Sequence, residues 1–387
     1  MIPVKYNIRN LRVRWMTTLM TVIGTGMVVW AMVLTFGLTE GLEHALRISG
    51  HPLELIVLRK GANDETSSTL TQQQALQLAA LDGIARDDAG KVLCANEFVT
   101  ILTKPRRNNG GTTNLIVRGV QDVSRELRPD FRIVQGRDIK PGVNEAITSE
   151  NMARRFENLG LGEKLEINKV DFQIVGYFEA GGSSAESEVW TDVRDIAGAR
   201  RSDEGISSVT LRATDAKTLD ALQKLIETDD QFKLKAVTET KYFEDQMSAA
   251  IAIKFVGFFI AFFLTFGAMF AAANTMFAAV ASRAREIGTL RAIGFRRASI
   301  LISFLFESIL LCLMGGLLGC LATLPFNGLS TGTANWATFS EITFAFRFGP
   351  KVILQGMLMA AAMGLVGGLF PAIRAVRMNI VTALREQ

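Results

Sequence analysis

Glu307 has the surroundings that most strongly suggest chemistry, because it is the one carboxylate inside a long apolar segment of this 387-residue chain. Acidic side chains within a membrane are rare, and they often belong to proton or ion pathways. Such a pathway needs polar partners at the same depth, and Asn274 is the only obvious one in another apolar segment. We therefore favour a helix–helix hydrogen bond for Glu307, or a position near the cytoplasmic surface, over a proton pathway.

The other residue types that bind metals or catalyse reactions lack the required spacing. Residues 160–164 come nearest to a phosphate-binding loop, but they depart from the Walker spacing and precede a predicted strand. His44 and His51 have no plausible third ligand, and the three cysteines show no metal-ligand spacing. The sequence therefore predicts a non-catalytic chain with no metal or cofactor of its own.

A basic segment at residues 281–298 is the second candidate site. Within it, Ile287, Leu290 and Ile293 fit one face of a short helix, and Gly294 fits the end of that helix. A short helix with an apolar stripe can insert into a groove of a partner protein. The alternative is a linker that lies on the membrane surface.

Four long apolar blocks must position these residues. Each is close to or above the roughly 20 residues that a helix needs to cross a bilayer. The first block has an apolar core too long for a signal peptide, and no clear cleavage site follows it. We therefore expect a membrane protein with four transmembrane α-helices: a first span at 15–38, a stalk and second span at 248–280, a third span at 299–325 and a fourth span at 351–372.

Lys and Arg residues indicate the orientation. They cluster in the first fourteen residues, in the connection 281–298 and in the tail 373–387, whereas the loop 326–350 carries only Arg347. Basic residues stay on the cytoplasmic side. We therefore expect a multi-pass protein of the inner (plasma) membrane with both termini in the cytoplasm and residues 39–247 outside. Because the arginines stand beside apolar blocks, the net charge of +4 favours membrane topology over nucleic-acid binding.

Residues 1–14 predict an amphipathic helix on the cytoplasmic surface of the membrane lipid. Val4, Ile8 and Leu11 recur at helical spacing beside a basic stripe. A simple positive anchor for the first span is the alternative, and it is compatible with the helix. The basic residues of this segment are Lys5, Arg9, Arg12 and Arg14.

Glycines recur at helix-face spacing in the last two spans, where small residues let helices approach closely in lipid. We assign them to packing of the transmembrane helices, together with Glu307. Both packing within one subunit and a dimer seam fit this pattern. The glycines are Gly315, Gly316 and Gly319 in the third span and Gly364, Gly367 and Gly368 in the fourth.

The outward stretch of about 200 residues is long enough to bury its own core. A strand–helix–strand pattern stands at each end of it, and two such units can combine into one ferredoxin-like α+β subdomain. Between them, short strands predict an inserted, mainly-β subdomain at about 131–203. The predicted strands are 53–58, 92–103, 146–149, 164–168, 172–178, 207–212 and 233–237, and the predicted helices are 71–81, 150–158 and 216–227.

At Arg285–Gly294 the chain resembles the FtsX/MacB-type permeases of ABC transporters, which include MacB-like, LolC/LolE-like and DevC-like members. The family carries the run R-E-I-G-x-L-R-A-[LI]-G after its second span, and this segment matches it throughout. Weaker matches lie at Pro371–Arg377 with Ala383–Arg385, at Asn7–Leu19 and at Ala146–Phe178. The resemblance therefore extends over the whole chain.

This resemblance implies a permease subunit that forms a dimer with a second copy or a paralogue. Each subunit would contact a separate cytoplasmic ABC ATPase, which binds ATP and Mg²⁺, through a coupling helix within 281–298. ATP-driven closure would then move the spans and the outward domain, a mechanism called mechanotransmission. The residues that the resemblance assigns to the coupling helix are Arg283, Arg285, Glu286, Ile287, Gly288, Leu290, Arg291 and Gly294.

The resemblance also limits the kinds of substrate. It implies export or extraction of a lipid, lipoprotein, peptide or small compound on the outer side, with a periplasmic adaptor as a further partner. The alternative is an FtsX-like signalling permease that activates an extracytoplasmic cell-wall hydrolase, a type that usually has a smaller outward domain. A membrane receptor without an ATPase is a third hypothesis, but it gives no reason for the motif at Arg285–Gly294.

Overall fold

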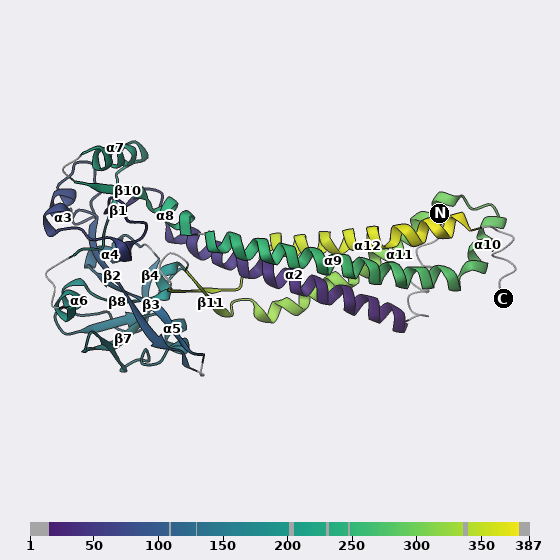
Figure 1. Cartoon of the computed structure of the whole chain (residues 1–387), viewed down its shortest axis with the longest axis horizontal. Helices are drawn as coiled ribbons and strands as arrows, with labels where there is room; N and C mark the ends of the chain where they lie inside the picture. The colour runs from purple at the N-terminus through teal and green to yellow at the C-terminus, as the bar shows by residue number, and fades with distance from the viewer. Residues whose placement is uncertain are drawn as a thin grey trace. The chain divides into compact units, whose positions relative to one another are not determined.

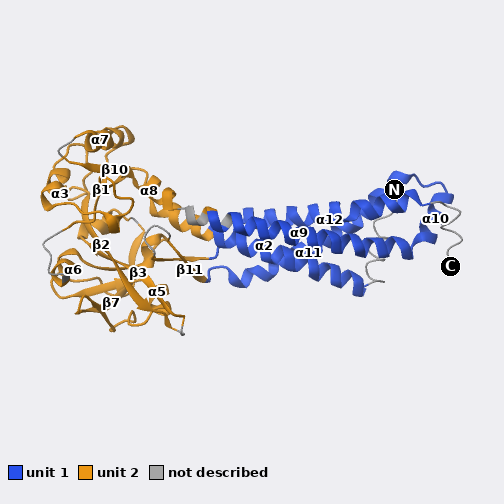
Figure 2. Ribbon diagram, viewed as in Figure 1, with its two compact units in different colours: residues 1–40, 252–329, 346–387 blue, residues 41–251, 330–345 orange. Residues whose placement is uncertain are grey.

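The computed structural model describes residues 15–107, 110–128, 130–200, 205–229, 232–246, 248–335 and 340–378 (Figure 1). The expected amphipathic helix at 1–14 and the tail after residue 378 lie outside the described residues. The chain divides into two compact units (Figure 2). We call residues 1–40, 252–329 and 346–387 the helical unit, and residues 41–251 and 330–345 the α/β unit.

Four helices of the described residues are long and apolar enough to cross a membrane, which confirms the predicted number of spans. Helices satisfy their backbone hydrogen bonds internally, as lipid requires. Two of them have 35 residues, or about 50 Å, and so exceed the ~30 Å hydrocarbon core of a bilayer. The four are α2 (Trp15–Ser49), α9 (Ser248–Ser282), α11 (Arg297–Thr323) and α12 (Pro350–Arg377).

The predicted packing glycines lie where these helices touch. A Cβ atom on Gly319 would stand 2.5 Å from the carbonyl oxygen of Gly26, so α11 approaches the backbone of α2. A Cβ atom on Gly367 would stand 3.0 Å from the carbonyl oxygen of Met269, so α12 approaches α9 in the same way. These glycines therefore pack within one subunit. The other four also meet helices of this chain: Gly315 meets α2, Gly316 meets α12, and Gly364 and Gly368 meet α11.

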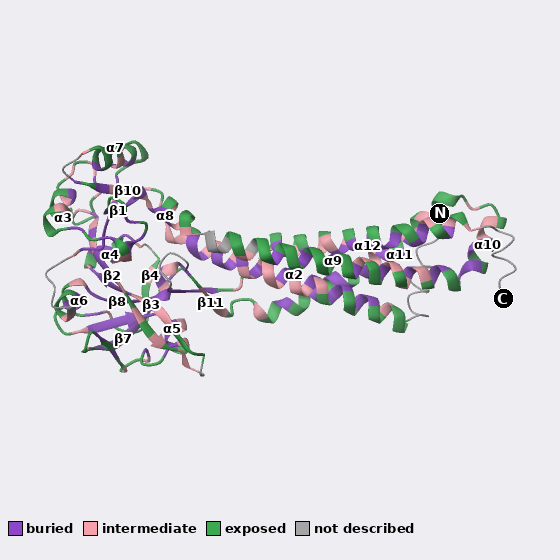
Figure 3. Ribbon diagram, viewed as in Figure 1, coloured by how far each residue is buried: buried purple, intermediate pink, exposed green. Residues whose placement is uncertain are grey.

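Figure 3 shows exposed residues along these four helices, and many of them are large apolar residues. The exposed apolar surface is densest on α9 and is stable in lipid rather than in water. It includes seven phenylalanines: Phe255, Phe258, Phe259, Phe262, Phe263, Phe266 and Phe270.

One half of the sheet in the α/β unit has the predicted ferredoxin-like topology. If its four strands are numbered in chain order, they lie side by side in the order 4-1-3-2, and all neighbouring strands are antiparallel. Buried side chains of the two helices and the strands form one hydrophobic cluster, which confirms the two strand–helix–strand units. The units are β1 (Glu54–Arg59), α3 (Gln72–Ala79) and β2 (Cys94–Pro105), then β9 (Ser208–Arg212), α7 (Ala216–Thr228) and β10 (Leu234–Thr238).

The inserted part begins before the expected residue 131. β2 is twelve residues long, and its residues 98–105 pair with β3 (Thr112–Val120) instead of β9. β3 in turn pairs in parallel with β8, so one ten-stranded sheet runs through both parts. The remaining elements here are α4 (Asp122–Glu126), β4 (Phe131–Gly136), β5 (Glu145–Thr148), α5 (Glu150–Arg155), β6 (Lys164–Ile167), β7 (Val170–Ala180), β8 (Glu188–Asp192) and α6 (Val193–Arg200).

The connection between α11 and α12, expected to be an outer loop at 326–350, contains a β-hairpin. It consists of β11 (Ser330–Ala334) and β12 (Glu341–Ala345), which pair antiparallel and belong to the α/β unit. β11 consists of Ser, Thr, Gly and Ala, and so it lacks the apolar pattern that predicts a strand, while β12 has only five residues.

Glu341 fastens this hairpin to the sheet. Its side chain is 1% exposed and accepts hydrogen bonds from Arg106 at 3.1 and 2.5 Å and from Arg155. Thr343 adds a backbone hydrogen bond to the Ser187 hydroxyl at 2.7 Å. A buried carboxylate between two guanidinium groups is bound strongly, because its removal leaves both cations without their partner.

Candidate functional site

The predicted coupling segment forms the short helix α10 (Ala284–Ala292). Gly294 ends it with a φ of +103°, and the Phe295 N–H donates to the Leu290 carbonyl at 3.1 Å. This left-handed backbone conformation favours glycine, so the predicted helix stop at Gly294 agrees with the structure.

The predicted apolar stripe of α10 does not form one outward face. Ile287 is 3% exposed and packs into the bundle beside Val280 and Ile300, whereas Ile293 is 71% exposed. At 3.6 residues per turn, two positions six apart point about 120° away from each other. The interpretation that Ile287, Leu290 and Ile293 share a surface is therefore wrong, and Ile287 belongs to the core.

Two opposite faces of α10 follow from this. The inner face is buried in the helical unit, and Gly288 lies on it with Ile287. The other face is exposed and is the part of α10 that a partner can reach. Its residues are Arg285, Glu286, Thr289, Ala292, Ile293 and Gly294.

Glu307 has a partner that we did not predict. The Arg283 guanidinium, just before α10, donates to both oxygens of the Glu307 carboxylate at 2.9 and 3.0 Å. The two residues are 6% and 3% exposed. Asn274, the companion considered from the sequence, lies on the exposed face of α9 instead. A buried ion pair between α10 and α11 thus accounts for Glu307, since parallel N–H···O bonds of this kind are strong and geometrically specific.

The other end of α10 is held by Arg291. Its guanidinium donates to the carbonyl oxygens of Val376 at 3.1 Å and Met378 at 3.0 Å. These carbonyls lie at the end of α12, where a helix has backbone acceptors without internal partners and a partial negative charge. Arg291 therefore acts as a cap for α12.

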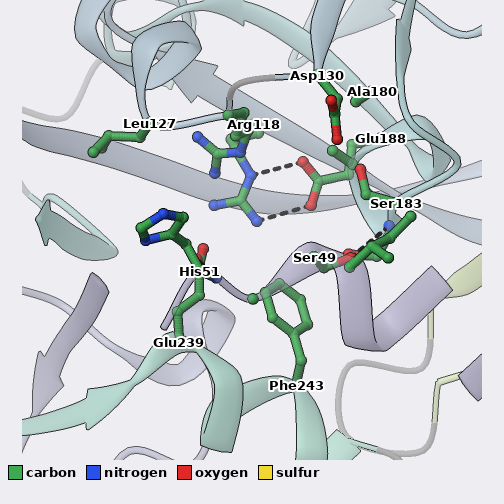
Figure 4. A pocket seen from close by; sticks show the side chains of 15 residues that line it. Ser49, His51, Arg118, Leu127, Asp130, Ala180, Ser183, Glu188, Glu239 and Phe243 are labelled. Atoms are coloured by element: carbon green, nitrogen blue, oxygen red, sulfur yellow. Dashed lines mark hydrogen bonds and ion pairs between the residues drawn. The ribbon is translucent and has the colours of Figure 1, made fainter. Parts of the chain in front are cut away.

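Polar side chains also converge at a cavity of about 90 Å³ in the α/β unit (Figure 4). At roughly 30 Å³ per molecule it holds about three waters, too little for a drug-sized ligand. On one side, Ser49 accepts a hydrogen bond from the Ser184 N–H at 2.8 Å, and the His51 N–H donates to Glu239 at 2.8 Å. Among the described residues, no group of His, Cys, Asp or Glu side chains is placed to bind a metal ion.

Arg118 on β3 is the centre of a charge network beside this cavity. It donates five hydrogen bonds of 2.7–2.8 Å to Glu65, Glu97 and Glu188. Arg128 donates two further bonds to Glu97. Glu97 lies in the predicted strand 92–103, whereas Glu65 and Glu188 lie outside the predicted elements, and no local pattern indicates that these carboxylates are buried.

Burial alone would raise the pKa of the Glu97 carboxyl, but the charges of Arg128 and Arg118 outweigh it and lower that pKa to about 2. Because the folded pKa lies below the unfolded value of about 4.3, Glu97 contributes stability above pH ~4 that is lost as the pH falls towards 2. The contribution at neutral pH is roughly 3 kcal/mol.

We therefore expect acid to expose the amides of β2 and β3 in the intact chain, and Glu97→Gln to expose them already at neutral pH. The expected reason is that the variant leaves Arg128 and Arg118 short of one buried anion. Hydrogen exchange of these peptides between about pH 7 and pH 3 measures both effects, with Glu179→Gln on the exposed side of β7 as the control. Equal acid sensitivity of the wild type and Glu97→Gln would contradict this account.

Two family patterns match the chain. The MacB-like periplasmic core domain matches residues 17–229, and the FtsX-like permease C-terminal matches residues 258–380. The first pattern covers more than half of the chain.

Curated relatives match over nearly the whole chain. A macrolide export ATP-binding/permease protein MacB of Chlorobium luteolum is 26% identical over 94% of this chain and 56% of its own length. The uncharacterized ABC transporter permease YknZ of Bacillus subtilis is 25% identical over 96% of this chain and 94% of its own length. The chain thus spans little more than half the length of the MacB relatives and nearly all of YknZ.

Two solved structures are similar to part of the chain. The extracellular domain of YknZ matches 48% of this chain with 14% identity and a TM-score of 0.36. The periplasmic region of MacB from Actinobacillus actinomycetemcomitans matches 54% with 13% identity and a TM-score of 0.38.

Proposed function

Because this chain belongs to the FtsX/MacB family of ABC transporter permeases, we propose that it transmits movement from a cytoplasmic ATPase to its α/β unit. The ATPase would bind ATP and Mg²⁺ and supply the energy. The α/β unit would use the movement to export or extract a lipid, lipoprotein, peptide or small compound on the outer side of the membrane. Two copies, or this chain and a paralogue, would form the membrane part, and an adaptor would be a further partner.

The exposed face of α10 is the observation that carries this proposal. A short helix whose inner face is buried in the bundle presents Arg285, Glu286 and Thr289 to a partner. Because the buried face of α10 packs against the spans, a movement of the partner bound to the exposed face would displace α10 together with the spans.

The interior of the helical unit supports mechanical transmission over conduction of a charged substrate. In the described part of this unit, Arg283 and Glu307 are the buried charged residues, and they neutralise each other. A pathway for ions or polar solutes needs charged or polar groups along its length.

The direct test is to find the partner of α10 in the native membrane. A photo-crosslinking amino acid at Thr289 of the full chain should capture an ABC ATPase, identified by mass spectrometry. The same group at Leu225, on the exposed side of α7, should not capture it. Capture from both positions, or no ATPase from Thr289, would contradict the proposal.

Orientation is part of the proposal and has its own test. In a chain with Cys94→Ala, Gly182→Cys should react with a membrane-impermeant thiol reagent added from outside, whereas Arg296→Cys should react only after the membrane is opened. Both positions are exposed on the protein surface, so access depends on the side of the membrane. Cys94 is the one cysteine of the α/β unit, and its replacement removes it as a competitor for the reagent. The reverse labelling pattern would overturn the orientation.

A further inference from the structure

α10 is not a rigid continuation of α9. The helix is interrupted at Arg283, where φ is −113° and ψ is 14°. The chain therefore changes direction between α9 and α10, and the peptide link alone leaves α10 free to pivot about this point.

Two contacts remove this freedom. At its C-terminal end, α10 joins α11 through the short stretch from Ile293 to Arg296. At its N-terminal end, Arg283 reaches Glu307, which stands ten residues into α11, or about 15 Å from its beginning. α10 is thus attached to α11 at both ends, and an element attached at both ends cannot pivot alone.

We propose that the Arg283–Glu307 ion pair makes α10 and α11 move as one rigid body. A displacement of α10 would then be transmitted to the helical unit through α11, the third span. Arg291 extends the same body to the end of α12. This inference rests on the proposed function for its biological meaning, but the joint motion itself is a property of this chain alone. Arg283 and Glu307 are positioning residues, since neither lies on the exposed face of α10.

The burial of the pair fits this role better than that of a simple stabilising contact. A buried ion pair gives little net stability over an apolar pair, because both charges lose their hydration. What it supplies is a fixed geometry, since two parallel hydrogen bonds hold the guanidinium and carboxylate planes together. A variant without charge at either position should therefore keep the fold but lose the fixed geometry between α10 and α11.

The experiment measures joint motion with spin labels at Thr289 on α10 and Ile302 on the exposed side of α11, in the full chain in lipid nanodiscs. The unmodified pair should give one narrow distance distribution. Arg283→Gln combined with Glu307→Gln leaves no unpaired buried charge, and we expect the chain to fold but the distribution to broaden. Arg283→Glu combined with Glu307→Arg restores a pair and should narrow it again. Glu227→Gln on α7 is the matched control and should change nothing.

ATP hydrolysis provides a second measurement that depends on the proposed function. In the double Gln variant, the stimulation of ATP hydrolysis by this chain should fall roughly tenfold. The variant with the exchanged pair should recover most of that stimulation. A distribution that stays narrow in the double Gln variant would overturn the inference, whatever the ATPase does. If the distribution broadens but ATP hydrolysis is unchanged, the ion pair does hold α10 to α11, and the proposed function is contradicted instead.

Discussion

Arg118→Met is expected to unfold much of the α/β unit while leaving the helical unit in place. The substitution keeps the approximate length of the side chain but removes the cation between Glu65, Glu97 and Glu188, which are 0–9% exposed. Removing one side of a buried charge network costs about 3–5 kcal/mol, a large part of the stability of a typical domain. Limited proteolysis and amide hydrogen exchange of β2, β3 and β8 in the full chain measure the loss.

Acid distinguishes this explanation from a simple packing defect. Arg118 is one of the two cations that lower the pKa of the Glu97 carboxyl, so in the Arg118→Met variant Glu97 should take up its proton at a higher pH, and the protection of β2 should fall less steeply with acid than in the wild type. Arg132→Met is the control, because Arg132 lies on β4 with 73% of its side chain exposed and pairs with Glu179 at the surface. If Arg118→Met had the stability of Arg132→Met at neutral pH, the network would have no structural importance.

Glu286→Lys is expected to abolish productive coupling to the ATPase without changing the fold. Glu286 lies on the exposed face of α10, and reversal of its charge places a cation where the partner surface meets an anion. Like charges brought together at an interface cost several kcal/mol, so we expect stimulated ATP hydrolysis to fall by at least about tenfold. The measurement compares basal and stimulated hydrolysis of the co-purified complex, together with its thermal unfolding.

A matched control keeps this second prediction specific. Glu227→Lys makes the same change on the exposed side of α7 and should leave stimulated hydrolysis at the wild-type level. Gly288→Trp, which the motif alone also suggests, is a poor test because Gly288 is buried and an indole there would disturb the bundle. Wild-type stimulation by Glu286→Lys would remove Glu286 from the proposed contact.

The sequence predicted the elements whose patterns are local. Four long apolar runs predicted the number of spans, because the backbone of each run must satisfy its hydrogen bonds within one helix. The periodicities at 53–103 and 207–237 predicted the ferredoxin-like half of the sheet, and Gly294 predicted the end of α10. Each of these inferences needs only a short window of residues.

What the sequence did not predict depends on pairs that are distant along the chain. Arg283 and Glu307 are 24 positions apart, and Arg118 is 53 positions from Glu65 and 70 from Glu188. The distribution of Lys and Arg assigned Arg283 to the cytoplasmic side, but no local pattern indicated that its side chain is buried, since an unpaired charge is rarely buried. Only the folded chain shows that the partners meet.

The role of Glu341 bears on how domains of this kind can recombine during evolution. The α/β unit is built from two stretches of the gene, residues 41–251 and 330–345, and Glu341 in the second is the buried partner of Arg106 and Arg155 in the first. A recombination event that replaced the first stretch alone would combine guanidinium groups from one ancestor with a hairpin from another. We therefore expect viable hybrids between relatives to inherit both stretches from the same parent, so that the heritable module follows the fold and not the continuous reading frame.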